Sequence, residues 1–156
     1  MTIIRADDLP RAALGPLLRE SAAQGFRFLD RLVREWEAGT HRFDGPGESL
    51  LLSWCGERLV GLCGVHRDPY QSDGAVARLR HLYVIEPKRR RGVGRRLVQE
   101  AVSMARQRCR RVRVRTDTAA ADAFYLALGF HRVEGEDSAT HVLALTGLAD
   151  EESTQR

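Results

Sequence analysis

The residues best suited to bind a ligand form a turn rich in arginine and glycine, Arg89-Arg90-Arg91-Gly92-Val93-Gly94. The turn follows an apolar run, Leu79 to Val84, and precedes a segment whose apolar residues recur at helical spacing. The first backbone N–H groups of a helix have no acceptor within the helix, and the helix dipole adds partial positive charge there. Glycines let an anion approach the backbone, and arginines add paired donors. The turn therefore predicts a site for a phosphate or pyrophosphate group.

The charge of the chain is divided unevenly. Residues 88–115 hold twelve basic residues and one acid, a net charge of +11, whereas the remainder of the 156 residues carries −7. This division suits an anionic ligand at one end of a site and a cationic ligand at the other.

Composition also excludes several classes of protein. The three cysteines, Cys55, Cys63 and Cys109, have no regular spacing, so we expect neither a disulfide framework nor a metal site. No apolar run approaches the roughly 20 residues that a membrane helix needs, and the first residues lack the layout of a signal peptide. We expect a cytoplasmic protein.

The order of elements that must position the turn is that of a mixed α/β domain. The pattern predicts strands at 3–5, 49–55, 58–66, 75–84, 112–116 and 140–145, and helices at 10–23, 26–38, 92–109 and 119–128. Three strands form an antiparallel meander, and the crossover through the third helix makes the strands at 75–84 and 112–116 parallel. We expect one domain over residues 1–147, followed by an acidic, disordered tail over 148–156.

Two motifs occur together in this framework. Leu82-Tyr83-Val84-x-x-Pro87 with Arg89-x-x-Gly92-x-Gly94 is similar to the acetyl-CoA signature of the GCN5-related N-acetyltransferase (GNAT) superfamily. The segment Ala121-Asp122-Ala123-Phe124-Tyr125, ending in Gly129-Phe130, resembles the second hallmark of that superfamily. The resemblance extends over essentially the whole chain and points to a bacterial branch with no assigned acceptor. It implies a GNAT fold, with two central parallel strands splayed apart and about four helices.

The resemblance also implies where acetyl-CoA binds. Its pantetheine arm would pair with the strand backbone, and its pyrophosphate would lie on the N–H groups of the turn. The residues so implied are Leu82, Tyr83, Val84, Arg89, Arg90, Arg91, Gly92, Val93, Gly94, Arg95, Thr118 and Ala121. Thr118 stands where the family often has a cofactor-binding asparagine; a threonine can keep one hydrogen bond or cap the helix.

Acetyl transfer to an amine needs a group to accept the amine proton and a group to protonate the departing thiolate. The resemblance implies direct attack of the amine on the thioester, and Tyr125 matches the tyrosine that lies near the cofactor sulfur. Tyr125 is therefore the candidate acid, with a core tyrosine as the alternative interpretation.

The base is less defined. Family members that use a strand glutamate carry it at the position of Arg78, which can instead bind a carboxylate or lie on a solvated face. Glu48 is either a base or a surface carboxylate. His81 has a suitable intrinsic pKa, but strict alternation turns it away from Arg78 and Arg80 unless a bulge intervenes, which favours a structural role. A chain of water molecules is a further alternative.

The predicted function is acetyl transfer from acetyl-CoA to a primary amine, with a cationic acceptor suggested by the acidic remainder of the chain. Two alternatives stay open: a non-catalytic GNAT-fold protein that binds acyl-CoA, and a nucleic-acid-binding module that uses residues 88–115. The second is disfavoured because that segment contains no aromatic residue on which bases could stack. No membrane partner is expected, and homodimers are common in the superfamily.

Overall fold

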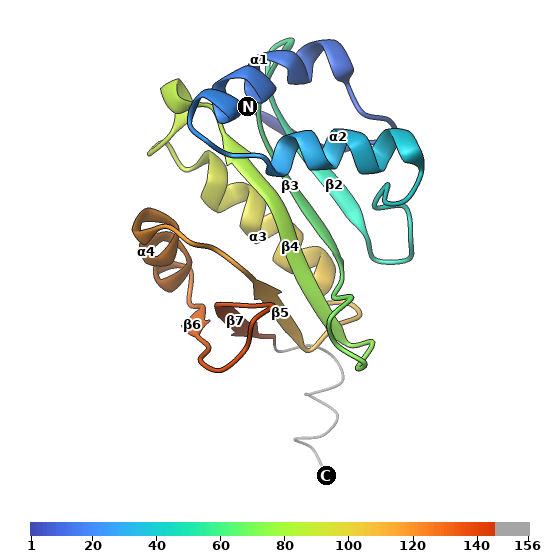
Figure 1. Ribbon diagram of the computed structural model, residues 1–156, viewed down its shortest axis with the longest axis vertical. Helices are drawn as coiled ribbons and strands as arrows, with labels where there is room; N and C mark the ends of the chain where they lie inside the picture. Colours follow the sequence, from blue (N-terminus) through green and yellow to red (C-terminus); the bar gives the residue numbers. More distant parts are fainter. Residues whose placement is uncertain (146–156) are drawn as a thin grey trace.

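The computed structural model describes residues 1–145, which form a seven-stranded mixed sheet and four α-helices (Figure 1). The strands lie in the order β1-β2-β3-β4-β5-β7-β6. Their bounds are β1 Thr2–Arg5, β2 Ser49–Cys55, β3 Arg58–Arg67, β4 Val76–Val84, β5 Arg111–Val114, β6 His131–Arg132 and β7 His141–Ala144. The helices are α1 Arg11–Ala23, α2 Phe28–Ala38, α3 Val93–Ala105 and α4 Ala119–Ala127. This architecture confirms the predicted mixed α/β fold.

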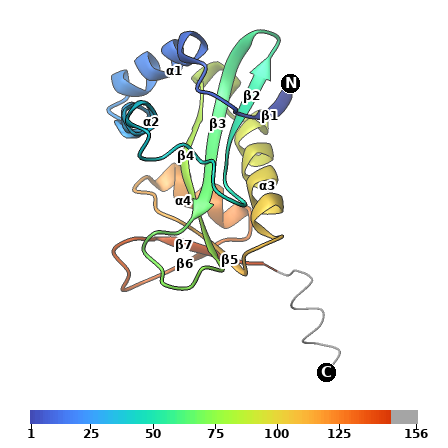
Figure 2. The same cartoon turned by 90° about the vertical axis from the view of Figure 1, so that its right-hand side faces the viewer.

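The helices form layers on the two faces of the sheet. Helices α1 and α2 cover one face, and α3 lies against the other (Figure 2). Each of these helices turns a row of apolar side chains toward the sheet. In α2 the buried residues are Leu29, Leu32, Val33 and Trp36, and in α3 they are Val93, Leu97, Val98, Ala101, Val102 and Ala105. No helix within residues 1–145 has the length and apolarity needed to cross a membrane.

The two parallel strands in the middle of the sheet separate along their length. Strand β4 pairs with β5 only where Val76, Ala77 and Arg78 face Arg111, Val112 and Arg113. Beyond Arg78, β4 continues to Val84 with β3 as its neighbour on one side and no strand on the other. The predicted splay is therefore present, and it leaves one edge of β4 without a neighbouring strand; we refer to the space between this open edge and α4 as the cleft.

Strand β4 contains a bulge beside that open edge. Its register against β3 shifts between Leu62 and Gly64, and His81 has a φ of 59°. A bulge re-aims the residue that it inserts. The ring of His81 consequently lies on the α2 side of the sheet, 6.4 Å from the ring of Phe28. Strict alternation placed His81 on the opposite face from Arg78 and Arg80 unless a bulge intervened, and the structure contains that bulge.

Several boundaries differ from the sequence prediction, among them the start of α2 at Phe28 instead of Phe26 and the end of β5 at Val114 instead of Thr116. The third helix was predicted to reach Cys109, but α3 ends at Ala105, where Arg108 N–H bonds back to the Ala105 carbonyl in a tighter turn. The two-residue strand β6 was not predicted, because two residues show no alternation. The predicted tail, 148–156, lies outside the described residues.

Gly64 of β3 leaves room for the buried ring of Phe43 to pack on the sheet. An added Cβ at Gly64 would lie 2.6 Å from a carbon of that ring. We expect Gly64→Ala to lower the free energy of unfolding by about 1–3 kcal/mol through overpacking. Gly15→Ala is the control, because its Cβ meets only the flexible end of Arg19 and the change favours helix α1. Chemical denaturation measures both, and equal stability of the two variants would contradict this account.

Candidate active site

The turn after β4 is built to receive an anion. A single 3-10 turn, Glu86–Lys88, leads into it, and Arg90 and Gly92 both take left-handed backbone angles, with φ of 63° and 82°. The hydrogen bonds of the turn end at Arg89 N–H, which bonds to Glu86, and resume at Arg96 N–H, which bonds to Gly92. The N–H groups between them, residues 90–95, donate no hydrogen bond to any part of the described chain. Successive free N–H groups at a helix N-terminus are an anion site.

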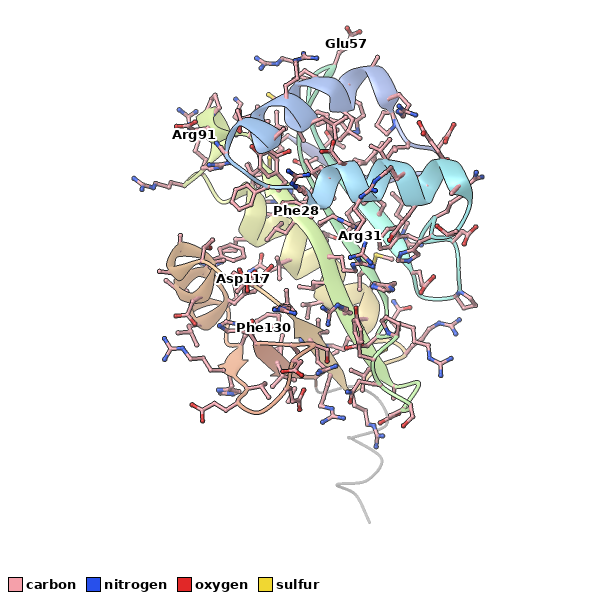
Figure 3. The ribbon with its side chains drawn as sticks, in the orientation of Figure 1. Phe28, Arg31, Glu57, Arg91, Asp117 and Phe130 are labelled. Carbon is pink, nitrogen blue, oxygen red and sulfur yellow. The ribbon has the colours of Figure 1, made fainter. Side chains whose placement is uncertain are left out.

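The arginines of the turn divide into two groups. Arg90, Arg91 and Arg95 are exposed and form no ion pair within residues 1–145, and Figure 3 shows Arg91 projecting from the turn. Arg89 turns back toward α1: its Nε donates to the Val84 carbonyl at 2.8 Å and its Nη2 to Gln24 at 2.9 Å. Arg89 thereby braces the turn, whereas the exposed arginines remain available to a ligand.

The wall of the cleft is the open edge of β4 over the predicted residues Leu82, Tyr83 and Val84. The side chain of Tyr83 points to the α1 side, where its hydroxyl donates to Glu20 at 2.6 Å and burial raises its pKa. Across the cleft mouth, an added Cβ at Gly94 would lie 3.6 Å from both Val84 and Phe124. The first turn of α3 therefore comes close to β4 and α4 together.

Tyr125 lies in this cleft on α4, packed by aromatic rings. Its ring is 5.0 Å from that of Phe124, 5.2 Å from Phe130 and 5.9 Å from His141. Only 3% of the residue is exposed, and its hydroxyl forms no hydrogen bond with the described chain. Burial raises the pKa of Tyr125, with a smaller effect from Cys63, whose own pKa burial raises to about 12. The tyrosine therefore keeps its proton at neutral pH, and its hydroxyl has no acceptor within residues 1–145.

The N-terminus of α4 is fixed by two devices. Thr118 caps the helix, because its Oγ1 accepts from Ala121 N–H at 3.1 Å, as one of the sequence interpretations expected. Asp122 accepts from Arg132 at 2.7 Å and lies 2.8 Å from His141 Nε2, which ties α4 to β6 and β7. This second network was not predictable from the sequence, because its three residues are distant along the chain and show no motif.

The closed end of the cleft carries buried charges that sequence reasoning also missed. Asp68 is fully buried and lies 2.8 Å from Arg113 and 3.9 Å from Arg78. Arg113 also pairs with Glu136 and bonds to Ser138 at 3.0 Å. These contacts fasten the loop after β3 and the loop before β7 to the short stretch where β4 and β5 still pair.

The α2 side of β4 presents several polar groups. Arg78 donates to the Ser138 carbonyl at 2.5 Å and lies 4.8 Å from the ring centre of Tyr70. Arg80 is half-buried and forms no hydrogen bond or ion pair with residues 1–145. His81 is 6% exposed, both of its ring nitrogens lack partners in the described chain, and burial lowers its pKa to about 3. In Figure 3, Phe28 and Arg31 of α2 lie over this stretch of β4.

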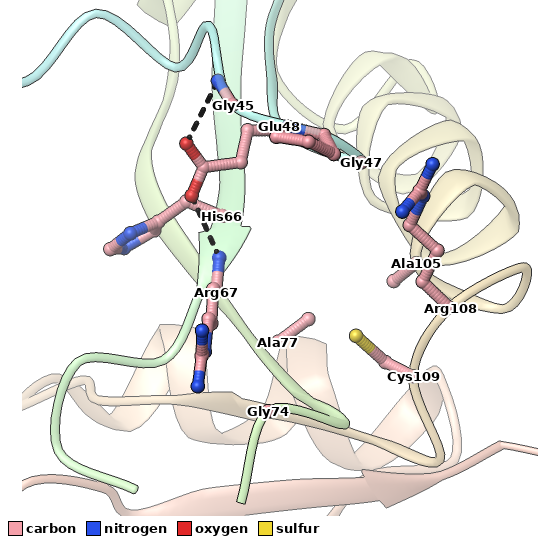
Figure 4. A pocket seen from close by; sticks show the side chains of 11 residues that line it. Gly45, Gly47, Glu48, His66, Arg67, Gly74, Ala77, Ala105, Arg108 and Cys109 are labelled. Atoms are coloured by element: carbon pink, nitrogen blue, oxygen red, sulfur yellow. Dashed lines mark hydrogen bonds between the residues drawn. The ribbon is translucent and has the colours of Figure 1, made fainter. Parts of the chain in front are cut away.

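Glu48 lies at the other end of the sheet from the turn. Its carboxylate accepts from Gly45 N–H at 3.2 Å and from Arg67 N–H at 3.0 Å (Figure 4). Beside it is a cavity of about 390 Å³ lined also by His66, Arg108 and Cys109. The three predicted catalytic residues are thus separate: Tyr125 in the cleft, His81 at the bulge and Glu48 at the far end.

A splayed sheet with an anion-binding turn after its central strand has the architecture of the acetyl-CoA-dependent N-acyltransferases to which the motifs pointed. The chain belongs to the acetyltransferase (GNAT) family, whose sequence profile matches residues 15–130. No curated protein sequence matches it.

Solved structures support the same fold. A structure assigned as an acetyltransferase of Exiguobacterium sp. 255-15 is 29% identical, with a TM-score of 0.83 over 96% of this chain and 97% of that chain. A GNAT-family acetyltransferase of Staphylococcus aureus Mu50 is 17% identical, with a TM-score of 0.74 over 93% and 99%. The ribosomal-protein-alanine N-acetyltransferase of Brucella melitensis is 18% identical, with a TM-score of 0.66 over 93% and 100%.

The Asp122 network predicts a pH-dependent stability. The hydrogen bond from Arg132, followed by that from His141, lowers the pKa of Asp122 below its usual 3.8. Such a group stabilises the fold above its unfolded pKa and loses this effect as the pH falls through its folded pKa. We expect Asp122→Asn to lower the unfolding temperature at pH 6 and the difference from wild type to shrink as the pH falls from about 4 toward 2.

Asp117→Asn is the matched control for this measurement by circular dichroism. Asp117 lies in the loop before α4 with its side chain 85% exposed, and its nearest cation, Arg115, is 4.0 Å away. An equal loss of stability in both variants at pH 6 would mean that net charge, and not the network, sets the effect.

Proposed function

We propose that the protein transfers an acetyl group from acetyl-CoA to a primary amine. The observation that carries the proposal is the run of unbonded N–H groups over residues 90–95 at the end of a strand whose edge is open. Pyrophosphate fits the first feature, and the amide-bearing pantetheine arm fits the second. The family to which the chain belongs generally uses acetyl-CoA as its donor.

The donor would contact the residues that the sequence predicted. The pyrophosphate would accept from the backbone N–H groups of the turn, which belong to Arg90, Arg91, Gly92, Val93, Gly94 and Arg95. Pantetheine would pair with the backbone of β4 from Leu82 to Val84. Arg89 shapes the turn, and the exposed arginines face the 3′-phosphate. Thr118 and Ala121 set the start of α4, which forms the other wall.

The chemical step needs two proton transfers. The amine nitrogen attacks the thioester carbonyl carbon, the new C–N bond forms as the C–S bond breaks, and the thiolate leaves. Tyr125 is the proposed donor of a proton to the thiolate, since no residue of the described chain engages its hydroxyl and it matches the motif tyrosine. The backbone N–H groups of the open β4 edge polarise the carbonyl oxygen.

The amine proton leaves on the α2 side. His81 stands at the bulge on that side and is uncharged at neutral pH, so its ring can accept a hydrogen bond from the amine or from water. Its pKa of about 3 makes it a poor final acceptor, which favours relay of the proton to solvent. Glu48, with both carboxylate oxygens bonded to backbone N–H groups, is the weaker candidate base.

The acceptor would approach past α2 and the loops at 40–48 and 68–74, because loops on a rigid scaffold usually determine specificity. The unpaired Arg80 stands on this side beside the bulge. The α2 side of β4 therefore offers the Arg80 guanidinium to an anionic group of the acceptor. Although the chain outside residues 88–115 is acidic overall, this side of the sheet is not uniformly negative.

Calorimetric titration with acetyl-CoA tests the proposal. We expect a dissociation constant in the micromolar range and about tenfold weaker binding of dephospho-CoA, since the exposed arginines would lose one charged partner. A nucleic-acid oligomer serves as the control for the basic segment, and its affinity should be weak and steeply salt-dependent. Absence of acetyl-CoA binding would overturn the proposed function.

Tyr125→Phe tests the acid. We expect turnover, followed as thiol release with an accepted amine, to fall about 100-fold while acetyl-CoA affinity stays within about twofold. The unfolding temperature should hardly change, because the hydroxyl forms no hydrogen bond within residues 1–145. Unchanged turnover would exclude Tyr125 as the acid while leaving acetyl-CoA binding in place.

A further inference from the structure

We infer that His41, Glu48 and His66 form a site for a divalent transition metal, with zinc as the ion that fits best. The three residues come from two segments: His41 and Glu48 lie in the loop between α2 and β2, and His66 lies near the end of β3. One ligand atom from each lies within 4.8 Å of the other two. The cluster takes no part in the proposed binding of acetyl-CoA, whereas Glu48 is also the weaker candidate base of the proposed transfer.

The donor set matches zinc chemistry. Two imidazoles and one carboxylate are a common protein ligand set for Zn²⁺, which leaves a fourth position for water. In a tetrahedral site with bonds of about 2.0–2.2 Å the ligand atoms are roughly 3.3 Å apart. Binding therefore has to draw the side chains together by up to about 1.5 Å. The loop that carries His41 can supply that movement without disturbing the sheet.

A buried nitrogen without a partner points independently to a ligand. His66 is 5% exposed, and its Nε2 forms no hydrogen bond with the described chain. A buried polar atom that lacks a partner costs free energy unless a water molecule or an ion satisfies it. A metal ion coordinated there would supply the missing interaction.

Neighbouring groups restrain two of the three ligands, His41 and Glu48. His41 Nδ1 lies 3.9 Å from the Glu35 carboxylate, beyond hydrogen-bond distance, so Glu35 adds negative charge beside the ring. The two N–H groups that bond to Glu48 orient its carboxylate, and its oxygens retain lone pairs. The ring of His41 also stacks on that of Phe43, 4.0 Å between centres, which limits its rotation.

The charge around the cluster is mixed. Glu48, Glu35 and Asp44 are the acids whose charges act on His41, against the cation Arg80, whereas the charges that act on His66 are those of Arg80, Arg78 and the neighbouring histidines. Glu48 and His66 also line the cavity of about 390 Å³ shown in Figure 4, which reaches the cluster from the Glu48 side, while the His66 ring points away from it. Bound there, the ion would join the 40–48 loop to β3 beside the acceptor side of the sheet.

Calorimetric titration of chelator-treated full-length protein with ZnCl₂ tests the inference, with metal content measured after dialysis. The background is Cys55→Ser, since the exposed Cys55 thiol can itself bind zinc. We expect one Zn²⁺ per chain with a dissociation constant of about 1 μM or lower. Glu48→Gln and His41→Ala should each weaken binding at least tenfold, and His131→Ala, at an exposed histidine on β6, should leave it unchanged.

Circular dichroism confirms that each variant is folded, and His41 and Glu48 are chosen as the primary targets because neither is fully buried. Absence of stoichiometric binding in the Cys55→Ser background would overturn the inference. Equal binding by the Glu48→Gln, His41→Ala and His131→Ala variants would overturn it as well, since the ion would then lie elsewhere. Acetyl-CoA affinity, measured on the same samples, reports on the proposed function separately.

Discussion

The parting of β4 from β5 is the constraint on which the rest of the structure depends. The two strands pair over three residues and then diverge, so the remainder of β4 presents an edge with no neighbouring strand. An open edge is usually blunted or covered, because its polar groups seek partners. Here two features lie beside that edge. The turn after β4 carries backbone N–H groups without acceptors, and the start of α4 is capped by Thr118. The separation therefore creates the cleft, and the cleft explains the positions of the turn and of Tyr125.

The angle of that cleft is set at its closed end. Asp68 lies without exposure between Arg113 and Arg78, one on each of the two parallel strands. Leaving a buried charge without its partner costs several kcal/mol. Movement of β4 relative to β5 that separated these charges would therefore be unfavourable. Asp122 holds α4 against β6 and β7 through Arg132 and His141. Arg113 pairs with Val142 and Val114 pairs with His141, so the two charge networks lie at neighbouring positions of β5 and β7.

The sequence predicted what depends on local pattern. Helix and strand order, the meander and the turn all follow from periodicity and from glycines, and Thr118 was interpretable as a cap because capping is local. The angle of His81 was not predictable, because the bulge arises from register against β3 and leaves no mark at His81 itself. The partners of Arg89 and Asp122 were hidden for a similar reason, since each contact joins residues distant along the chain. The approach of His41 and His66 to Glu48 likewise depends on where two loops meet the sheet.

The proposed donor end of the site is formed by backbone groups and the proposed acceptor end by side chains. Family membership therefore indicates the donor but not the acceptor. The donor end is formed largely by backbone groups, which any sequence that keeps the turn and the splay will reproduce. The acceptor end is formed by side chains such as Arg80 and His81, which the fold does not dictate. A relative that is 29% identical can therefore share the whole fold and the donor while presenting a different surface to its acceptor. If the proposed transfer is correct, the choice of amine depends on the few side chains beside the bulge, such as Arg80 and His81, and not on the fold.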